Sequence, residues 1–212
     1  MIRFLESLQV DLVIALDLHS IKIPELFHIP ITHVSALPIF VKKIQSPIFN
    51  ALVDEKNPSK FLKNSVLVSP DMGGLRRIEQ MSTMLGGLPW IATVKDRDLV
   101  TGEIAIKTFD GPLHPDALSG KRAIIVDDMI SSGKTVVQAA ELLKNHGVVS
   151  CDILVTHAVF SEEAPVLLQE SNVDRIYVTN SVSVPKAKRF PKLHVLSVAE
   201  VIAKAIKNKS KR

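Results

Sequence analysis

Short runs of consecutive apolar residues alternate along this chain with stretches in which apolar residues recur every three or four positions. The apolar runs predict strands near residues 12–17, 66–70, 90–94, 104–108, 123–127, 152–159, 175–179 and 194–197. The wider spacing predicts helices near residues 39–54, 74–86, 134–146, 163–171 and 198–208. Apolar strands that alternate with helices are typical of a parallel sheet covered on both faces, so we expect an α/β fold with three layers.

The segment AIIVDDMISSGKTVV, residues 123–137, is the strongest candidate for chemistry. An apolar run leads to Asp127 and Asp128, and the small residues Ser131, Ser132 and Gly133 then precede a predicted helix. Backbone amides in such a loop, together with the positive end of the helix dipole, bind phosphate. Neighbouring carboxylates accept hydrogen bonds from sugar hydroxyls. The pattern therefore favours a phosphorylated sugar as ligand.

Two other interpretations of this segment were weighed. Gly133, Lys134 and Thr135 resemble the end of a P-loop, but that motif requires a glycine where Asp128 stands, so we reject it. An ordinary strand with solvated aspartates before a helix remains open for the segment taken alone. The segments around it argue for the functional interpretation.

The segment resembles the ribose-phosphate loop of type I phosphoribosyltransferases and of ribose-phosphate pyrophosphokinases. Two more strand ends resemble the pyrophosphokinases specifically: DLH at residues 17–19 and VSPDMGG at residues 68–74. Residues 91–97 correspond to the family's strand leading into a flexible catalytic loop, and residues 156–161 and 176–181 follow in the family's order. The resemblance covers nearly the whole chain.

The resemblance implies a ribose-phosphate diphosphokinase. Such an enzyme transfers diphosphate from ATP to ribose 5-phosphate, giving phosphoribosyl pyrophosphate and AMP, with Mg²⁺ as cofactor. It implies that His19 and Asp71 bind the metal and that Lys95 and Arg97 are catalytic. The ribose 5-phosphate site that it implies consists of Asp127, Asp128, Ser131, Ser132, Gly133, Lys134 and Thr135.

The family has two similar domains, and the resemblance implies that this chain carries one of them in full. We expect a phosphoribosyltransferase-like domain at residues 38–197. Residues 1–37, with a C-terminal helix at 198–212, are expected to be a remnant of the other domain. The family's N-terminal third, with its ATP-contacting segments, is expected to be absent. Lys134 also departs from the family, which commonly has glycine there; a positive φ at this position would strain lysine.

Two alternative functions follow from these departures. The chain could be a phosphoribosyltransferase that consumes phosphoribosyl pyrophosphate, which Lys134 favours slightly and His19 and Asp71 argue against. It could instead be a truncated, non-catalytic subunit associated with a full-length synthetase. Homo-oligomerisation and association with such a subunit both remain open as partner interactions.

Composition excludes several other classes of protein. The chain has 212 residues, of which 46% are hydrophobic, and it has one cysteine, so no internal disulfide framework can form. Five basic residues follow Glu200 without an aromatic residue among them, which argues against nucleic-acid binding. No apolar stretch approaches the ~20 residues of a membrane span, and Glu6 and Asp11 interrupt any signal-peptide core. We expect a cytoplasmic protein.

Overall fold

A seven-stranded sheet forms the centre of the computed structural model, which describes residues 2–19, 22–46, 49, 62–97 and 104–209. For residues 95–97 and 104–107 it describes the backbone only. The strands, in sheet order, are β5 (Ile104–Asp110), β4 (Trp90–Arg97), β3 (Ser65–Ser69), β6 (Arg122–Ile130), β7 (Ser150–Ala158), β8 (Arg175–Thr179) and β9 (Leu193–Leu196). All neighbouring pairs are parallel except β4 and β5.

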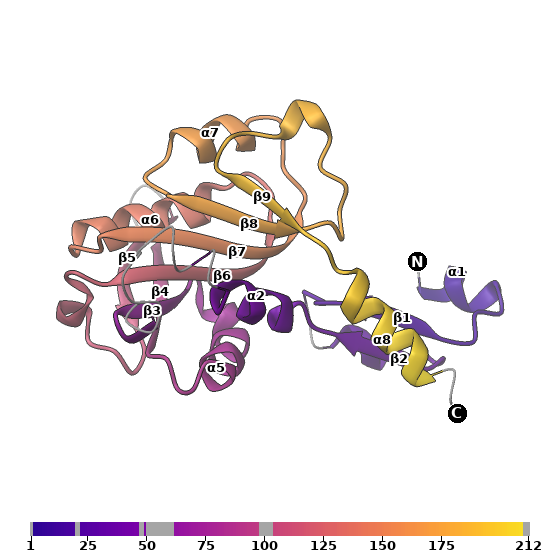
Figure 1. Ribbon diagram of the computed structural model, residues 1–212. Helices are drawn as coiled ribbons and strands as arrows, with labels where there is room; N and C mark the ends of the chain where they lie inside the picture. Colours follow the sequence, from indigo (N-terminus) through magenta and orange to yellow (C-terminus); the bar gives the residue numbers. More distant parts are fainter. Residues whose placement is uncertain (1, 20–21, 47–48, 50–61, 98–103, 210–212) are drawn as a thin grey trace.

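Helices cover both faces of this sheet (Figure 1). Alternate side chains of a strand face opposite sides, so each central strand contributes to two cores. Ile125 of β6 packs with α6 (Lys134–Asn145) and α7 (Ala164–Glu170), whereas Ile124 packs with α2 (Leu37–Ile44) and α5 (Leu75–Met84). This arrangement confirms the three-layer α/β fold. Short 3₁₀ helices at η1 (Ile23–Leu26), η2 (Met72–Gly74), η3 (Pro115–Leu118) and η4 (Lys186–Lys188) complete the connections.

A second, smaller unit lies beside the sheet (Figure 1). It consists of the parallel strands β1 (Val13–Leu16) and β2 (Ile31–Val34), with α1 (Ile2–Ser7) and α8 (Ala199–Lys209). Helix α8 contacts both strands, although it is at the opposite end of the chain. None of the described residues in these four elements is fully buried. We propose that this small unit and the large sheet correspond to the two expected domains, divided near residues 37 and 198.

The structure differs from the sequence prediction at helix α1, which was not predicted, and at four further places. Strand β2 was not predicted because its sequence, ITHV, is short and half polar, and its pairing with β1 stabilises it. Helix α2 ends at Ile44, and most of the remaining predicted helix, up to residue 54, lies outside the described residues. Strand β6 continues past Asp127 and Asp128 to Ile130 because β7 runs beside it that far. The pair β4 and β5 is antiparallel, as short connections allow.

Among the helices in the described part of the chain, none combines the length and apolar character that crossing a membrane requires.

Candidate functional site

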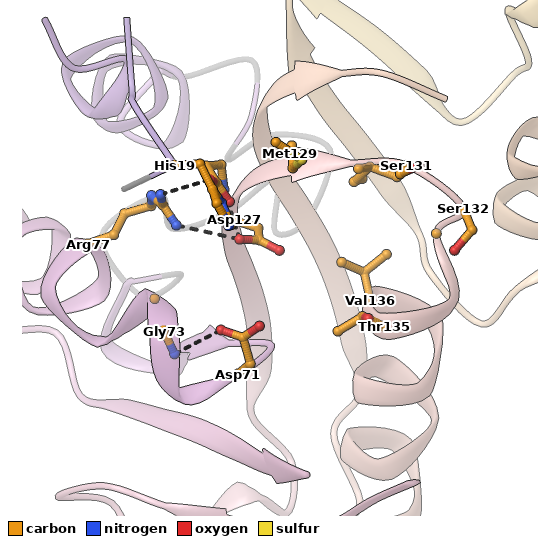
Figure 2. Close-up of a pocket in the computed structure, with 14 residues that line it drawn as sticks. His19, Asp71, Gly73, Arg77, Asp127, Met129, Ser131, Ser132, Thr135 and Val136 are labelled. Atoms are coloured by element: carbon orange, nitrogen blue, oxygen red, sulfur yellow. Dashed lines mark hydrogen bonds and ion pairs between the residues drawn. The ribbon is translucent and has the colours of Figure 1, made fainter. Parts of the chain in front are cut away.

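A cavity of about 450 Å³ opens where β3 and β6 end, between the start of α5 and the start of α6. Figure 2 shows Asp71 and Gly73 on one side of it and Ser132 and Thr135 on the other. Ligands of parallel α/β sheets bind beyond the carboxyl ends of the strands. The cavity is lined by His19, Asp71, Gly73, Gly74, Arg77, Asp127, Asp128, Met129, Ile130, Ser131, Ser132, Gly133, Thr135 and Val136. Eight of the eleven site residues expected from the sequence are among them.

The loop after β6 has the geometry of an anion-binding turn. Gly133 has a φ of +83°, and its carbonyl accepts the first helical hydrogen bond, from Val137 N at 3.0 Å. The carbonyl of Ser131 accepts from Ser161 N at 3.0 Å, which ties the loop to the segment after β7. The loop and the first turn of α6 line the cavity, and the backbone amides of a helix N-terminus can bind a phosphate.

Lys134 is the first residue of α6 and has no positive φ, so the strain considered for it does not arise. The left-handed conformation belongs to Gly133 instead. The Lys134 side chain is exposed and is not part of the cavity lining. Its role in sugar-phosphate binding stays a prediction, and only its backbone is placed to take part.

Asp127 and Asp128 are consecutive strand residues and therefore face opposite sides of the sheet. Asp128 shares a face with Val126, which packs in the α2 and α5 core, and is 4% exposed. Asp127 shares a face with Ile125, which packs in the α6 core. The Asp127 carboxylate also accepts a hydrogen bond from the amide of Asp128 at 2.8 Å. At the end of the strand both residues nevertheless line the same cavity.

Arg77 of α5 joins the two carboxylates and was missed in the sequence analysis. Its Nη1 lies 3.4 Å from Asp127 Oδ1, and its Nη2 lies 3.6 Å from Asp128 Oδ2 (Figure 2). The side chain is 19% exposed, so solvent screens these ion pairs only in part. A basic residue in the first turn of a helix that follows the neighbouring strand was the available sequence signal.

The environment separates the proton affinities of the two carboxyl groups. Burial, followed by hydrogen bonding to Asp128, raises the pKa of Asp127 to about 7. Burial also disfavours the charged form of Asp128, but hydrogen bonds to Asp127 and His19 and the charge of Arg77 hold its pKa below the usual range. Two carboxyl groups this close share one proton readily. Near neutral pH the pair can both donate and accept hydrogen bonds.

His19 reaches this cavity from the small unit. Its Nδ1 lies 2.6 Å from Asp128 Oδ2, although 109 residues separate the two in the sequence. The imidazole is 73% exposed, although Asp128 holds its Nδ1. The contact places a residue of the small unit in the wall of the cavity formed by the large sheet.

Asp71 follows β3 and forms the N-cap of η2, where its Oδ1 accepts from Gly73 N at 3.0 Å. No three His, Cys, Asp or Glu side chains among the described residues gather closely enough to hold a metal by themselves. Mg²⁺ binds in proteins through one or two carboxylates and keeps waters and substrate oxygens as its other ligands. The cavity presents carboxylates of this kind and therefore fits a partly hydrated ion rather than a closed metal centre.

Lys95 and Arg97 belong to β4, the neighbour of β3 in the sheet, and the structure describes only their backbone. Their side chains lie outside what the structure describes, so their assignment as catalytic residues stays a prediction.

A second cavity, of about 390 Å³, adjoins the first and shares His19, Gly73 and Arg77 with it. Arg76 and Gln80 of α5 line its far side, and Asp17 and His33 of the small unit line its near side. The two cavities therefore adjoin at a shared wall that includes Arg77, and we call them together the cleft.

Gly133 provides a first test of the loop. In Gly133→Ala the new Cβ would lie 3.1 Å from Leu168, at a φ that costs other residues about 1–2 kcal/mol. We expect a loss of at least that size in the free energy of urea unfolding, together with weaker ribose 5-phosphate binding by calorimetry. Gly86→Ala is the matched control, because Gly86 has a φ of +80° but no atom within 4 Å of the added Cβ. Unchanged ligand binding in Gly133→Ala would contradict the assigned role of the loop.

The raised pKa of Asp127 predicts a pH-dependent stability. An unfolded aspartate titrates near ~3.9, so between there and about 7 the folded chain holds a proton that the unfolded chain has lost. Stability contributed by this group therefore falls as the pH rises through that window. Asn at this position does not titrate, so the melting temperature of Asp127→Asn, measured relative to that of the wild type, should rise between about pH 5 and about pH 8. Asp116→Asn, at a 90% exposed carboxylate, should follow the wild-type curve. Parallel curves for all three proteins would rule out the buried titration.

Known proteins resemble this chain over most of its length. Residues 112–211 match the family described as the phosphoribosyl synthetase-associated domain. The ribose-phosphate pyrophosphokinase of Gloeobacter violaceus is 36% identical over 197 residues, which cover 93% of this chain and 54% of the relative. The corresponding protein of Aquifex aeolicus is 34% identical over 195 residues, which cover 92% of this chain and 56% of that relative.

A solved structure agrees with these relatives. The phosphoribosylpyrophosphate synthetase of Mycobacterium smegmatis superposes with a TM-score of 0.81 at 29% identity, over 99% of this chain and 62% of that structure. The chain spans about half the length of the curated relatives it matches. The shared sequence, the shared fold and the strand-end motifs agree, and the chain is similar to ribose-phosphate pyrophosphokinases over nearly its whole length.

Proposed function

We propose that this chain carries out, or contributes a substrate site to, the ribose-phosphate diphosphokinase reaction. In this reaction diphosphate passes from ATP to the anomeric hydroxyl of ribose 5-phosphate, giving phosphoribosyl pyrophosphate and AMP. The observation that carries the proposal is the single cavity shared by the Gly133 loop, the Asp127 and Asp128 carboxylates and His19. A phosphate site and a hydroxyl site on the same cavity wall suit a sugar phosphate.

Ribose 5-phosphate would bind with its phosphate at the start of α6. Backbone amides near Gly133 and the hydroxyl groups of Ser131, Ser132 and Thr135 supply donors there. The carboxyl pair of Asp127 and Asp128 would receive the ribose hydroxyls. Since the pair is partly neutralised by Arg77, it can bind an anionic sugar phosphate without strong repulsion.

The phosphoryl donor would occupy the adjoining cavity, where Arg76 and Arg77 present positive charge to its phosphates. Asp71 and His19 would hold Mg²⁺ with waters and phosphate oxygens, and the ion, when bound, neutralises charge on the phosphates. The chain itself would align the sugar hydroxyl with the donor across the shared wall, which is the main source of catalysis in phosphoryl transfer. Lys95 and Arg97 would offset the charge that develops on the transferred group.

A coupled assay tests this proposal directly. AMP release from ATP is measured with Mg²⁺, with and without ribose 5-phosphate, and sugar binding is measured in parallel by calorimetry. Sugar-dependent AMP release would support the diphosphokinase reaction. Sugar binding without AMP release would reduce the proposal to a retained substrate site, and the absence of both would overturn it.

Lys95→Ala separates transition-state stabilisation from binding. If Lys95 acts on the transferred group, the variant should lose turnover by about 100-fold or more, with ribose 5-phosphate affinity nearly unchanged. Lys121→Ala, at a lysine outside both cavities, serves as the control. Equal losses in turnover and in sugar affinity would contradict the catalytic role.

A second candidate function is that of a non-catalytic subunit that associates with a full-length synthetase. It is favoured by the small unit, whose described elements contain no fully buried side chain. Such a unit gains stability when a partner covers it. Co-purification with a catalytic subunit, and no AMP release by the chain alone, would establish this alternative. We propose a cytoplasmic location for either function, consistent with the single, buried cysteine.

A further inference from the structure

Asp17, which directly follows β1, is a buried carboxylate outside the carboxyl pair just described. It is 7% exposed, and its Oδ2 accepts hydrogen bonds from Thr156 Oγ1 at 2.6 Å and from the amide of Ala36 at 3.0 Å. Its backbone has a φ of +38°, which is unusual for a residue other than glycine. Contacts that hold a residue in such a conformation also determine the direction in which the chain continues.

The chain continues toward Asp128. In the register of β6 and β7, Asp127 lies opposite Val155 and Met129 lies opposite His157. Asp128 and Thr156 are therefore neighbours on adjacent strands, on the same face. Residue 17 contacts Thr156 and residue 19 contacts Asp128, so two alternate residues of the small unit meet two adjacent strands of the large sheet.

His157 makes a second set of contacts with the turn that follows β1. His157 Nε2 lies 3.2 Å from the carbonyl oxygens of both Leu16 and Asp17. Because both partners are acceptors, this nitrogen carries the proton. With the proton on Nε2, Nδ1 is an acceptor, and it lies 2.9 Å from Ser181 Oγ, which is also 3.0 Å from the carbonyl oxygen of Thr156. The chain at the end of β1 is thus held through the side chain of Asp17 and through the carbonyl groups of Leu16 and Asp17.

We propose that Asp17 is a positioning residue that sets His19 against Asp128. The effect of Asp17 on catalysis rests on the proposed function, whereas its effect on the position of His19 does not. Without the carboxylate, the positive φ at residue 17 loses its support, and the turn relaxes so that the imidazole leaves the cavity. Asn at this position keeps an oxygen acceptor and tolerates the left-handed region, so it should preserve the turn.

Side-chain NMR of the imidazole groups tests the structural content without any activity. The His19 signals are identified by their loss in His19→Gln. We expect Asp17→Ala and Thr156→Val to shift them toward their positions in Asp128→Asn, whereas Asp17→Asn stays near the wild type. Lys42→Ala is the control, because it removes the 3.3 Å ion pair between Lys42 of α2 and Glu200 of α8, a contact with the small unit that does not involve residues 17 to 19. Unchanged His19 signals in both Asp17→Ala and Thr156→Val would overturn the proposal.

A double-mutant cycle tests the catalytic consequence. Asp17→Ala should lower kcat/KM for AMP release by roughly 100-fold, as a small displacement of a positioned group does. In a His19→Ala background the same change should cost less than about twofold, because the two act as one unit. Additive losses would overturn the positioning role. If the wild type releases no AMP, the proposed function fails, and the NMR result alone decides the role of Asp17.

Discussion

The two-sided packing of β6 determines where every group of the site lies. This strand is fourth of seven, and its residues alternate between two apolar cores. A central strand cannot shift without disturbing both cores, because protein interiors are close-packed. The carboxylates of Asp127 and Asp128 and the loop that follows them are therefore supported by the most rigid part of the molecule. Sites on such elements keep their geometry better than sites on loops.

Placing two carboxylates on a buried strand has an electrostatic cost that the structure offsets locally. Arg77 contacts both groups, and His19 contacts the more buried one. Burial, followed by hydrogen bonding to Asp128, still raises the pKa of Asp127 to about 7. The same arrangement suits a ligand with several hydroxyl groups, because a carboxyl pair with one proton between them can both donate and accept. Stability and ligand binding thus depend on the same charges.

The cleft depends on the contact between the large sheet and a small unit that has little core of its own. Strands β1 and β2 expose part of every residue, and a two-stranded sheet is marginal by itself. The buried contacts of Asp17 and His157 compensate, because they satisfy polar groups on both sides of the junction. His19 reaches the cavity from the small unit across this junction. The junction is therefore part of the site and not only a connection between units.

The sequence by itself determined most of the order of strands and helices, the position of the loop at residues 131–133 and the candidate residues at the strand ends. These features are local, since periodicity, glycine and strand-end acids each act within a few residues. Strand β2, the antiparallel β4 and β5 pair, and the extension of β6 to Ile130 were not predicted, because pairing with a distant segment decides them. The role of Arg77 was also missed, since it depends on the neighbouring strand. The approach of His19 to Asp128 and the burial of Asp17 needed the tertiary structure, because the partners lie more than a hundred residues apart.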